Sequence, residues 1–392
     1  MPSSARLAGT LLFATACATS VVPTAKVVAN MSGGDFAPLA VGGGFVVSGN
    51  PLTVWRARQL QSRRSVREHP GALAVARDGH ACATVAAAPA VGLRSYRLPG
   101  LDPMQVVGDA CNDMVTISAA GTLVACAQRS VEQGKVQTQI RVFSFPDLKP
   151  VQSFAPLTES VEALSFVGAQ DDQVAVAVTF VEPPYRADDY RSRIDLYDTR
   201  GGNVVGSLTQ KGRFSRLAFA QQDEIFIWAG QSGIQAWSVR SRAQLKVFGA
   251  TSHTIAVALS PDARLLAASY GEYAVSDQAT AGGGTIQILD MTSGELLASF
   301  GSTELRAAAS PHDDDEMLNE RPRVRVQFEL LGAPTIKNRQ PVFGDLFGGT
   351  YHVANHETLA FVDNDTLFSA GRGFFALWTL NQAAILKARQ PR

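Results

Sequence analysis

One short pattern recurs seven times along the chain, and it constrains the fold more than any other feature of the sequence. Each copy places an apolar residue, any residue, an apolar or small residue, and then a large aromatic residue or leucine. Successive large residues lie about 40 to 54 positions apart, and the last step is about twice as long. This spacing is typical of a four-stranded β-propeller blade with variable loops. The copies are LTVW ending at Trp55, LRSY at Tyr96, IRVF at Phe143, IDLY at Tyr197, IQAW at Trp237, IQIL at Leu289 and FALW at Trp378.

Segments on either side of the pattern predict the other strands of each blade. A turn opens a strand before it, as in SPDARLLAASY (260–270), and a polar turn and a further strand follow it, as in DMTSGELLASF (290–300). Alternating small and apolar residues, with almost no 3.6-residue periodicity, predict an all-β fold. We therefore expect a single β-propeller with seven four-stranded blades. The expected blades are 36–69, 70–110, 113–157, 160–211, 213–250, 253–302 and 350–388.

The chain divides into four regions on this interpretation. They are an N-terminal segment (1–35), the first six blades (36–302), a non-repeating insertion with a disordered start (303–349), and the last blade with a C-terminal tail (350–392). An eighth, degenerate blade in the insertion is the alternative. We expect AKVVANM (25–31) to pair with the C-terminal blade, because a ring closed by N- and C-terminal strands has no open edge.

The stretch RLAGTLLFATACA (6–18) has two incompatible interpretations. Arg6 before an apolar run, with small residues around Cys17, is typical of a secretion signal. The same stretch repeats the Ala-Gly-Thr-Leu turn of AAGTLVACAQ (119–128), which predicts a structural strand. We favour the strand and keep cleavage or lipidation at Cys17 as the alternative.

Charge and cysteine usage narrow the classes of partner and compartment. Acidic and basic residues balance at 35 each, so no basic surface for nucleic acid is expected. Apart from residues 7–18, no apolar run approaches the roughly 20 residues that span a bilayer. Cys17, Cys82, Cys111 and Cys126 have no paired spacing, so we expect neither a disulfide framework nor a zinc site. Unpaired thiols favour a reducing compartment, hence the cytoplasm.

No motif predicts catalysis or a cofactor. His352 and His356 stand four positions apart, but in a strand such residues are about 13 Å apart and cannot share a metal. The glycine triplets at 42–44 and 282–284 open no helix and precede no Gly-Lys-Ser/Thr, so they are predicted to be turn glycines. No Gly-x-Ser-x-Gly sequence occurs. The prediction is therefore a non-enzyme with no metal and no cofactor.

Two phrases of the sequence carry a family resemblance. SPDARLLAASYGEY (260–273) and LYDTRGG (196–202) resemble the WD40-like family of β-propellers. The Trp-Asp pair of that family is absent, and Tyr197 and Leu289, each followed by Asp, are its nearest equivalents. The resemblance extends over nearly the whole chain. It implies a platform for protein partners, usually without catalysis.

The expected function is a non-catalytic scaffold or assembly subunit that binds protein partners. The alternative is an exported bacterial envelope protein, lipid-anchored through Cys17. Minor alternatives are a propeller enzyme and a guanine-nucleotide exchange propeller, to which VGGGFVVSGNPLTVWR (41–56) is similar. Two charged runs are the candidate partner-binding surfaces. They contain Arg58, Arg63, Arg64 and Arg67 in the first run and Asp313, Asp314, Asp315 and Glu316 in the second.

Overall fold

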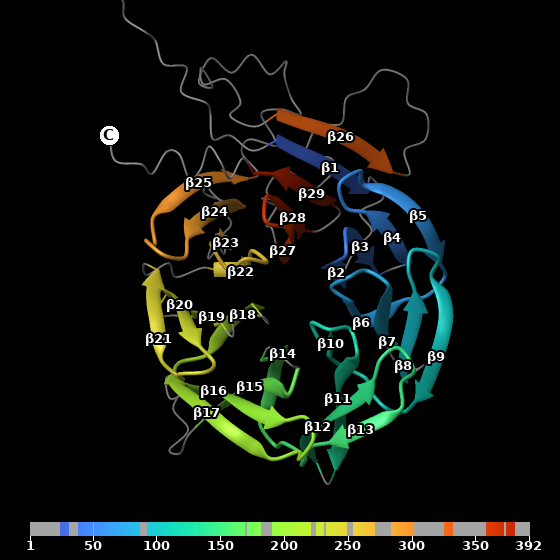
Figure 1. Cartoon of the computed structure of the whole chain (residues 1–392), viewed down its shortest axis with the longest axis vertical. Coiled ribbons are helices and arrows are strands. Elements are labelled where there is room, and N and C mark those ends of the chain that lie inside the picture. The colour runs from blue at the N-terminus through green and yellow to red at the C-terminus, as the bar shows by residue number, and fades with distance from the viewer. Residues whose placement is uncertain are drawn as a thin grey trace, which may run out of the picture.

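Seven small β-sheets surround a common axis in a computed structural model of the chain (Figure 1). The structure describes residues 24–30, 38–49, 51–86, 92–132, 134–168, 171–181, 190–220, 225–230, 233–248, 254–270, 284–301, 325–331, 358–371 and 374–380.

Each of the first six sheets, blades 1 to 6, contains four consecutive antiparallel strands. The first strand of a blade lies nearest the axis and the fourth lies at the rim (Figure 1). Blades 1 to 3 contain β2 (Leu39–Gly42), β3 (Phe45–Ser48), β4 (Leu52–Arg56) and β5 (Gln61–Val66); β6 (Pro70–Val75), β7 (Ala81–Ala86), β8 (Gly92–Arg97) and β9 (Asp102–Gly108); and β10 (Val115–Ile117), β11 (Leu123–Glu132), β12 (Lys135–Ser144) and β13 (Pro150–Ser153). Blades 4 to 6 contain β14 (Ser160–Val167), β15 (Gln173–Val181), β16 (Tyr190–Asp198) and β17 (Val204–Lys211); β18 (Phe214–Ala220), β19 (Ile225–Gly230), β20 (Gly233–Ser238) and β21 (Gln244–Phe248); and β22 (Thr254–Leu259), β23 (Leu265–Tyr270), β24 (Thr285–Asp290) and β25 (Leu296–Gly301).

Strands from distant parts of the chain form the seventh sheet, blade 7. Its own three strands are β27 (Thr358–Asp363), β28 (Thr366–Gly371) and β29 (Phe374–Thr379). The fourth strand is β1 (Thr24–Asn30), which pairs antiparallel with β29, and β26 (Arg325–Leu331) lies outside β1 and parallel to it. The predicted closure of the ring by N- and C-terminal strands is confirmed, and the described residues form seven blades. β26, which lies in the expected insertion, makes blade 7 a five-stranded sheet.

In blades 1 to 6, the large residue of the repeated motif lies at a β-bulge in the third strand. In blade 1 the register with β5 shifts between Val54 and Trp55, and the same shift recurs in blades 2 to 6. The fifth residue after the large one has a positive φ in all six of these blades, in the turn that leads to the rim strand. These residues are Leu60, Leu101, Leu148, Gly202, Arg242 and Gly294. A bulge bends a strand and increases its twist, so the motif marks where each blade curves toward its rim.

A buried apolar cluster packs blade 7 against blade 1. Trp55 and Phe375 meet edge to face, with ring centroids 5.1 Å apart. Val46 of blade 1 and Leu377 of blade 7 belong to the same buried cluster. Because full burial of one large apolar side chain contributes roughly 1.5–3 kcal/mol, this cluster stabilises the closed ring beyond the strand pairing alone.

Two tryptophans at equivalent places in blades 1 and 7 make the same buried hydrogen bond. The Trp55 indole N–H donates to Ser48 Oγ at 3.0 Å, and the Trp378 indole N–H donates to Ser369 Oγ at 2.8 Å. Each serine lies on the second strand of its blade, and both are buried. A buried indole N–H without an acceptor is costly, so these serines make a tryptophan at the motif position tolerable in the core.

The expectation of unpaired cysteines is wrong for two of them. Cys111, in the connection from blade 2 to blade 3, forms a disulfide with Cys126 on β11, and both are fully buried. The connection runs back along β11, which brings the two Cα atoms to 5.9 Å, inside the range a disulfide requires. Cys82 is free and buried, and burial, followed by the charge of Glu68, raises the pKa of its thiol to about 12.

Replacing Val28 by Pro tests the dependence of the ring on β1. β1 has a neighbouring strand on each side, so its N–H groups have ladder partners on whichever side they face. Proline removes one such donor, and we expect Val28→Pro to lower the free energy of unfolding by about 1–3 kcal/mol. Denaturant unfolding followed by circular dichroism measures this. The control Val28→Thr keeps the N–H and the β-branched side chain, and equal losses in both variants would contradict the expectation.

Candidate functional site

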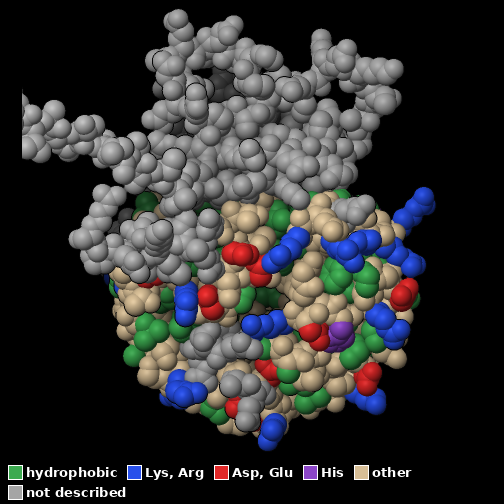
Figure 2. All heavy atoms as spheres, turned by 45° about the horizontal axis from the view of Figure 1, so that its top comes forward, with side chains coloured by type: hydrophobic (Ala, Val, Ile, Leu, Met, Phe, Trp, Pro, Cys, Tyr) green, Lys and Arg blue, Asp and Glu red, His purple; other side chains and the backbone are tan. Residues whose placement is uncertain are grey.

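A cavity of about 560 Å³ opens at one end of the axis, among the turns that join the first and second strands of the blades. Its wall is formed by the innermost strands β2, β6, β10 and β27 and by the turn of blade 6. Figure 2 shows basic and acidic side chains gathered around the hollow at the centre of this face. We call this cavity the channel mouth. Its volume is within the range of known ligand sites, about 300–1,000 Å³.

Glycines allow the turns of blades 1 and 2 to approach each other at the channel mouth. Gly43 has a φ of +53°, and a Cβ built there would lie 2.2 Å from the backbone nitrogen of Gly79. Gly44 also has a positive φ, +77°, but a Cβ there would meet nothing within 4 Å. Gly43 and Gly44 are therefore the turn glycines that the sequence predicts. Of these two, Gly43 is also required by the contact between blades, as is Gly42, where a Cβ would lie 2.5 Å from the backbone oxygen of Ala76.

Hydrogen bonds join the turns of other neighbouring blades around the same end of the axis. The carboxylate of Asp171, a buried residue of blade 4, accepts the N–H groups of Ala119 and Ala120 of blade 3 at 3.0 and 2.9 Å. Between blades 7 and 6, Asn364 Oδ1 accepts the N–H of Asp262 at 3.0 Å. These bonds hold the turns in fixed positions, so the channel mouth is shaped before any ligand arrives.

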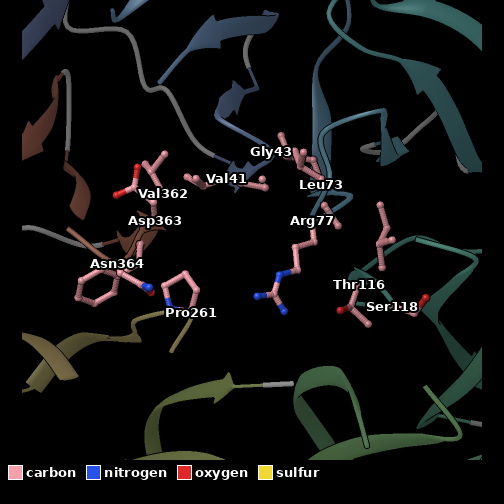
Figure 3. Close-up of a pocket in the computed structure, with 16 residues that line it drawn as sticks. Val41, Gly43, Leu73, Arg77, Thr116, Ser118, Pro261, Val362, Asp363 and Asn364 are labelled. Carbon is pink, nitrogen blue, oxygen red and sulfur yellow. The ribbon is translucent and has the colours of Figure 1, made fainter. Parts of the chain in front are cut away.

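Three hydrogen-bond donors face the channel mouth without a protein partner in the described part of the chain. Figure 3 shows Arg77 extending from the turn between β6 and β7 into the space between Pro261 and Thr116. No hydrogen bond or ion pair occupies its guanidinium among the described residues. The same is true of the Asn364 Nδ2 amide and of the Thr116 hydroxyl. The site therefore presents unused donor capacity toward a common space.

A second hollow of about 430 Å³ adjoins the channel mouth and shares Gly43 and Asp363 with it. Arg58, in the turn after β4, lines this hollow and forms an ion pair with Asp363 at 2.9 Å. Burial acts to raise the pKa of Asp363, but hydrogen bonds from Asp365, Thr366 and Arg58 outweigh it and lower that pKa. The hydrogen bond with Asp363 raises the pKa of Asp365. Asp363 is therefore the ionised partner of Arg58 across the junction of blades 7 and 1.

The residues of the predicted basic run do not form one patch. Arg58 lies at the second hollow, beside the channel mouth. Arg63 and Arg64 lie on the rim strand β5, and Arg64 is 3.4 Å from Asp102 of blade 2. Arg67 follows β5 and is exposed. The structure thus brings only the first of these four arginines to the channel mouth, and partner binding by the run stays a prediction.

Several other predicted features lie outside the described residues. They include the acidic run Asp313, Asp314, Asp315 and Glu316, the pair His352 and His356, and the stretch 6–18 with Cys17.

Sequence reasoning missed Arg77, Thr116 and Asn364. Their only local signal is that Arg77 and Asn364 belong to turn sequences, Arg-Asp-Gly and Asp-Asn-Asp, ahead of a second strand. Nothing in the sequence near Thr116 indicates that it faces a cavity.

Within the described ranges, no three His, Cys, Asp or Glu side chains lie close enough together to hold a metal ion. In the same part of the chain, no helix has the length and apolar character needed to cross a membrane. No protein-family profile matches the sequence, and a comparison with curated proteins finds no match.

The contact at Gly43 leads to a stability test with a matched control. A Cβ at Gly44 costs only the positive φ, roughly 1–2 kcal/mol, whereas a Cβ at Gly43 also collides with the backbone of blade 2. We therefore expect Gly43→Ala to lower the free energy of unfolding clearly more than Gly44→Ala does. Urea unfolding of both variants measures the difference. Equal losses would show that blades 1 and 2 do not meet through these turns.

Proposed function

We propose that this chain is a non-catalytic, WD40-like propeller that binds a protein partner at the channel mouth. The observation that carries the proposal is a concave site with convergent, unused donors on turns that are tied together by hydrogen bonds. Binding sites of this kind combine apolar walls with a few placed polar groups. A rigid site also loses little conformational entropy on binding, which favours affinity.

The proposed surface includes both hollows on this face. Arg58 and Asp363 hold each other at the junction of blades 7 and 1, while Arg77 remains available inside the channel mouth. Exposed arginines near the centre of an interface are frequent anchors of binding energy. The repeated four-stranded blades, each curved at an aromatic residue or leucine, support the WD40-like assignment, and with it a platform role.

Site-specific photo-cross-linking tests the proposed surface. p-Benzoylphenylalanine at Ala120 places the probe on an exposed turn beside the channel mouth, and the backbone N–H of that residue keeps its bond to Asp171. The same probe at Val151, which is exposed on the rim strand β13, is the control. We expect discrete protein adducts from Ala120 and none from Val151 in cells that naturally make the protein. Adducts from Val151 alone would place the partner elsewhere, and none from either position would contradict protein binding.

A second candidate role, as a propeller of the cell envelope, is favoured by the Cys111–Cys126 disulfide. Disulfides form and persist in oxidising compartments and are rare in the cytoplasm. The thiol-based argument for a cytoplasmic location no longer applies to these two residues. We therefore propose export, with 6–18 as the signal and Cys17 as the site of lipidation, as the alternative setting for the same scaffold.

The mature protein from its natural source distinguishes the two settings. Export predicts an oxidised Cys111–Cys126 pair and an N-terminus at or beyond Cys17, with added lipid mass if Cys17 is acylated. Thiol titration under denaturing conditions and intact-mass measurement report both properties. An N-terminal Met1 together with reduced Cys111 and Cys126 would support the cytoplasm and contradict export.

A further inference from the structure

The positive charge of Arg77 is not neutralised by the acidic residues nearest to it in the sequence or in the cavity. Asp78, the next residue, binds His80 instead. Its Oδ1 lies 2.5 Å from the imidazole Nδ1 of His80 and also accepts the backbone N–H of His80 at 3.1 Å. Asp363, which lines the same cavity, is held by Arg58. The guanidinium of Arg77 thus points into the channel mouth as an unpaired cation of the described chain.

The neighbouring polar groups add donors rather than acceptors. Asn364 Oδ1 is occupied by the Asp262 N–H, which leaves the Nδ2 amide as the available group. Ser118 Oγ accepts the N–H groups of Thr122 and Leu123, while Thr116 keeps a free hydroxyl. A cavity that presents a cation, an amide and a hydroxyl from its walls is complementary to an anion that has several acceptor oxygens.

We infer that the channel mouth binds the carboxylate of an acidic side chain supplied by the protein partner, with Arg77 as its counter-ion. The inference rests on the proposed function and names the chemistry of the group that enters the site. A guanidinium matches the two oxygens of a carboxylate in a planar, bidentate arrangement. Apolar wall residues, among them Val41, Leu73 and Val362, suit the methylene stem of such a side chain.

The charge balance favours a carboxylate over a phosphate. Asp363 lines the same cavity but is paired with Arg58, so among the described lining residues Arg77 supplies the uncompensated positive charge. One unpaired guanidinium offsets one negative charge. A phosphorylated side chain carries nearly two at neutral pH and requires more basic residues than Arg77 supplies here.

Peptide selection on the full chain tests the inference. A library of random twelve-residue peptides is panned against the immobilised protein, and each selected peptide is measured by calorimetry beside a copy in which Asp becomes Asn or Glu becomes Gln. We expect the selected peptides to share one acidic residue whose neutralisation weakens binding about tenfold or more. Arg77→Gln weakens binding of the acidic peptide by a similar factor and leaves binding of its neutral copy unchanged. Arg77→Lys keeps the positive charge but loses the planar, bidentate donors of the guanidinium. We therefore expect its affinity for the acidic peptide to fall between those of the unmodified chain and Arg77→Gln.

The control variant is Arg129→Gln, because Arg129 is an exposed arginine on β11 and lies outside the residues that line the channel mouth. Circular dichroism confirms that the variants fold. Peptides that need no acidic residue, or that bind Arg77→Gln as well as the unmodified chain, overturn the inference but leave the proposed function standing. A library that yields no binder also overturns the inference, and the Ala120 cross-link decides the proposed function independently.

Discussion

The pairing of β1 with β29 is the constraint on which the rest of the structure depends. Each blade buries its two faces against its neighbours, so the ring is stable only when the last blade also packs against the first. β1 comes from near the start of the chain, whereas β27 to β29 come from near its end, so blade 7 cannot be completed until both are present. The contact between Trp55 and Phe375 then joins blade 7 to blade 1.

Closure of the ring also creates the candidate site. The channel mouth exists only because the turns of blades 6, 7, 1, 2 and 3 converge at one end of the axis. Gly43 lets two of these turns touch, and Asp171 and Asn364 join others through backbone N–H groups. The consequence is that Arg77 extends from a fixed base into a formed cavity, which is the arrangement that a recognition site requires. Stability of the ring and geometry of the site therefore have the same origin.

Part of this fold follows from local sequence alone. The motif copies from Trp55 to Leu289 recur at the spacing of one blade, with a turn and a further strand on each side, and this predicts the third strands. The strand at 25–31 is predictable because a ring needs a partner for its last edge. β26 is not, since no pattern near it indicates that it pairs with β1. The Cys111–Cys126 bond is not, since no pattern indicates that the connection after β9 runs back along β11. Arg77 and Asn364 are ordinary turn residues until the blades are assembled.

The sequence by itself determined the fold class, because this depends on periodicity and on local turn chemistry, and it favoured seven blades and a closing strand at 25–31. The tertiary structure decided against an eighth blade within the described residues. Only the tertiary structure decided which side chains share the channel mouth and which cysteines pair. It also separated Arg58 from Arg63, Arg64 and Arg67, although all four lie in one short run. The reason is physical: the make-up of the channel mouth depends on distances between residues on different blades, which ring closure sets. The cysteine pair and the separation of the four arginines depend on how the chain folds around neighbouring strands.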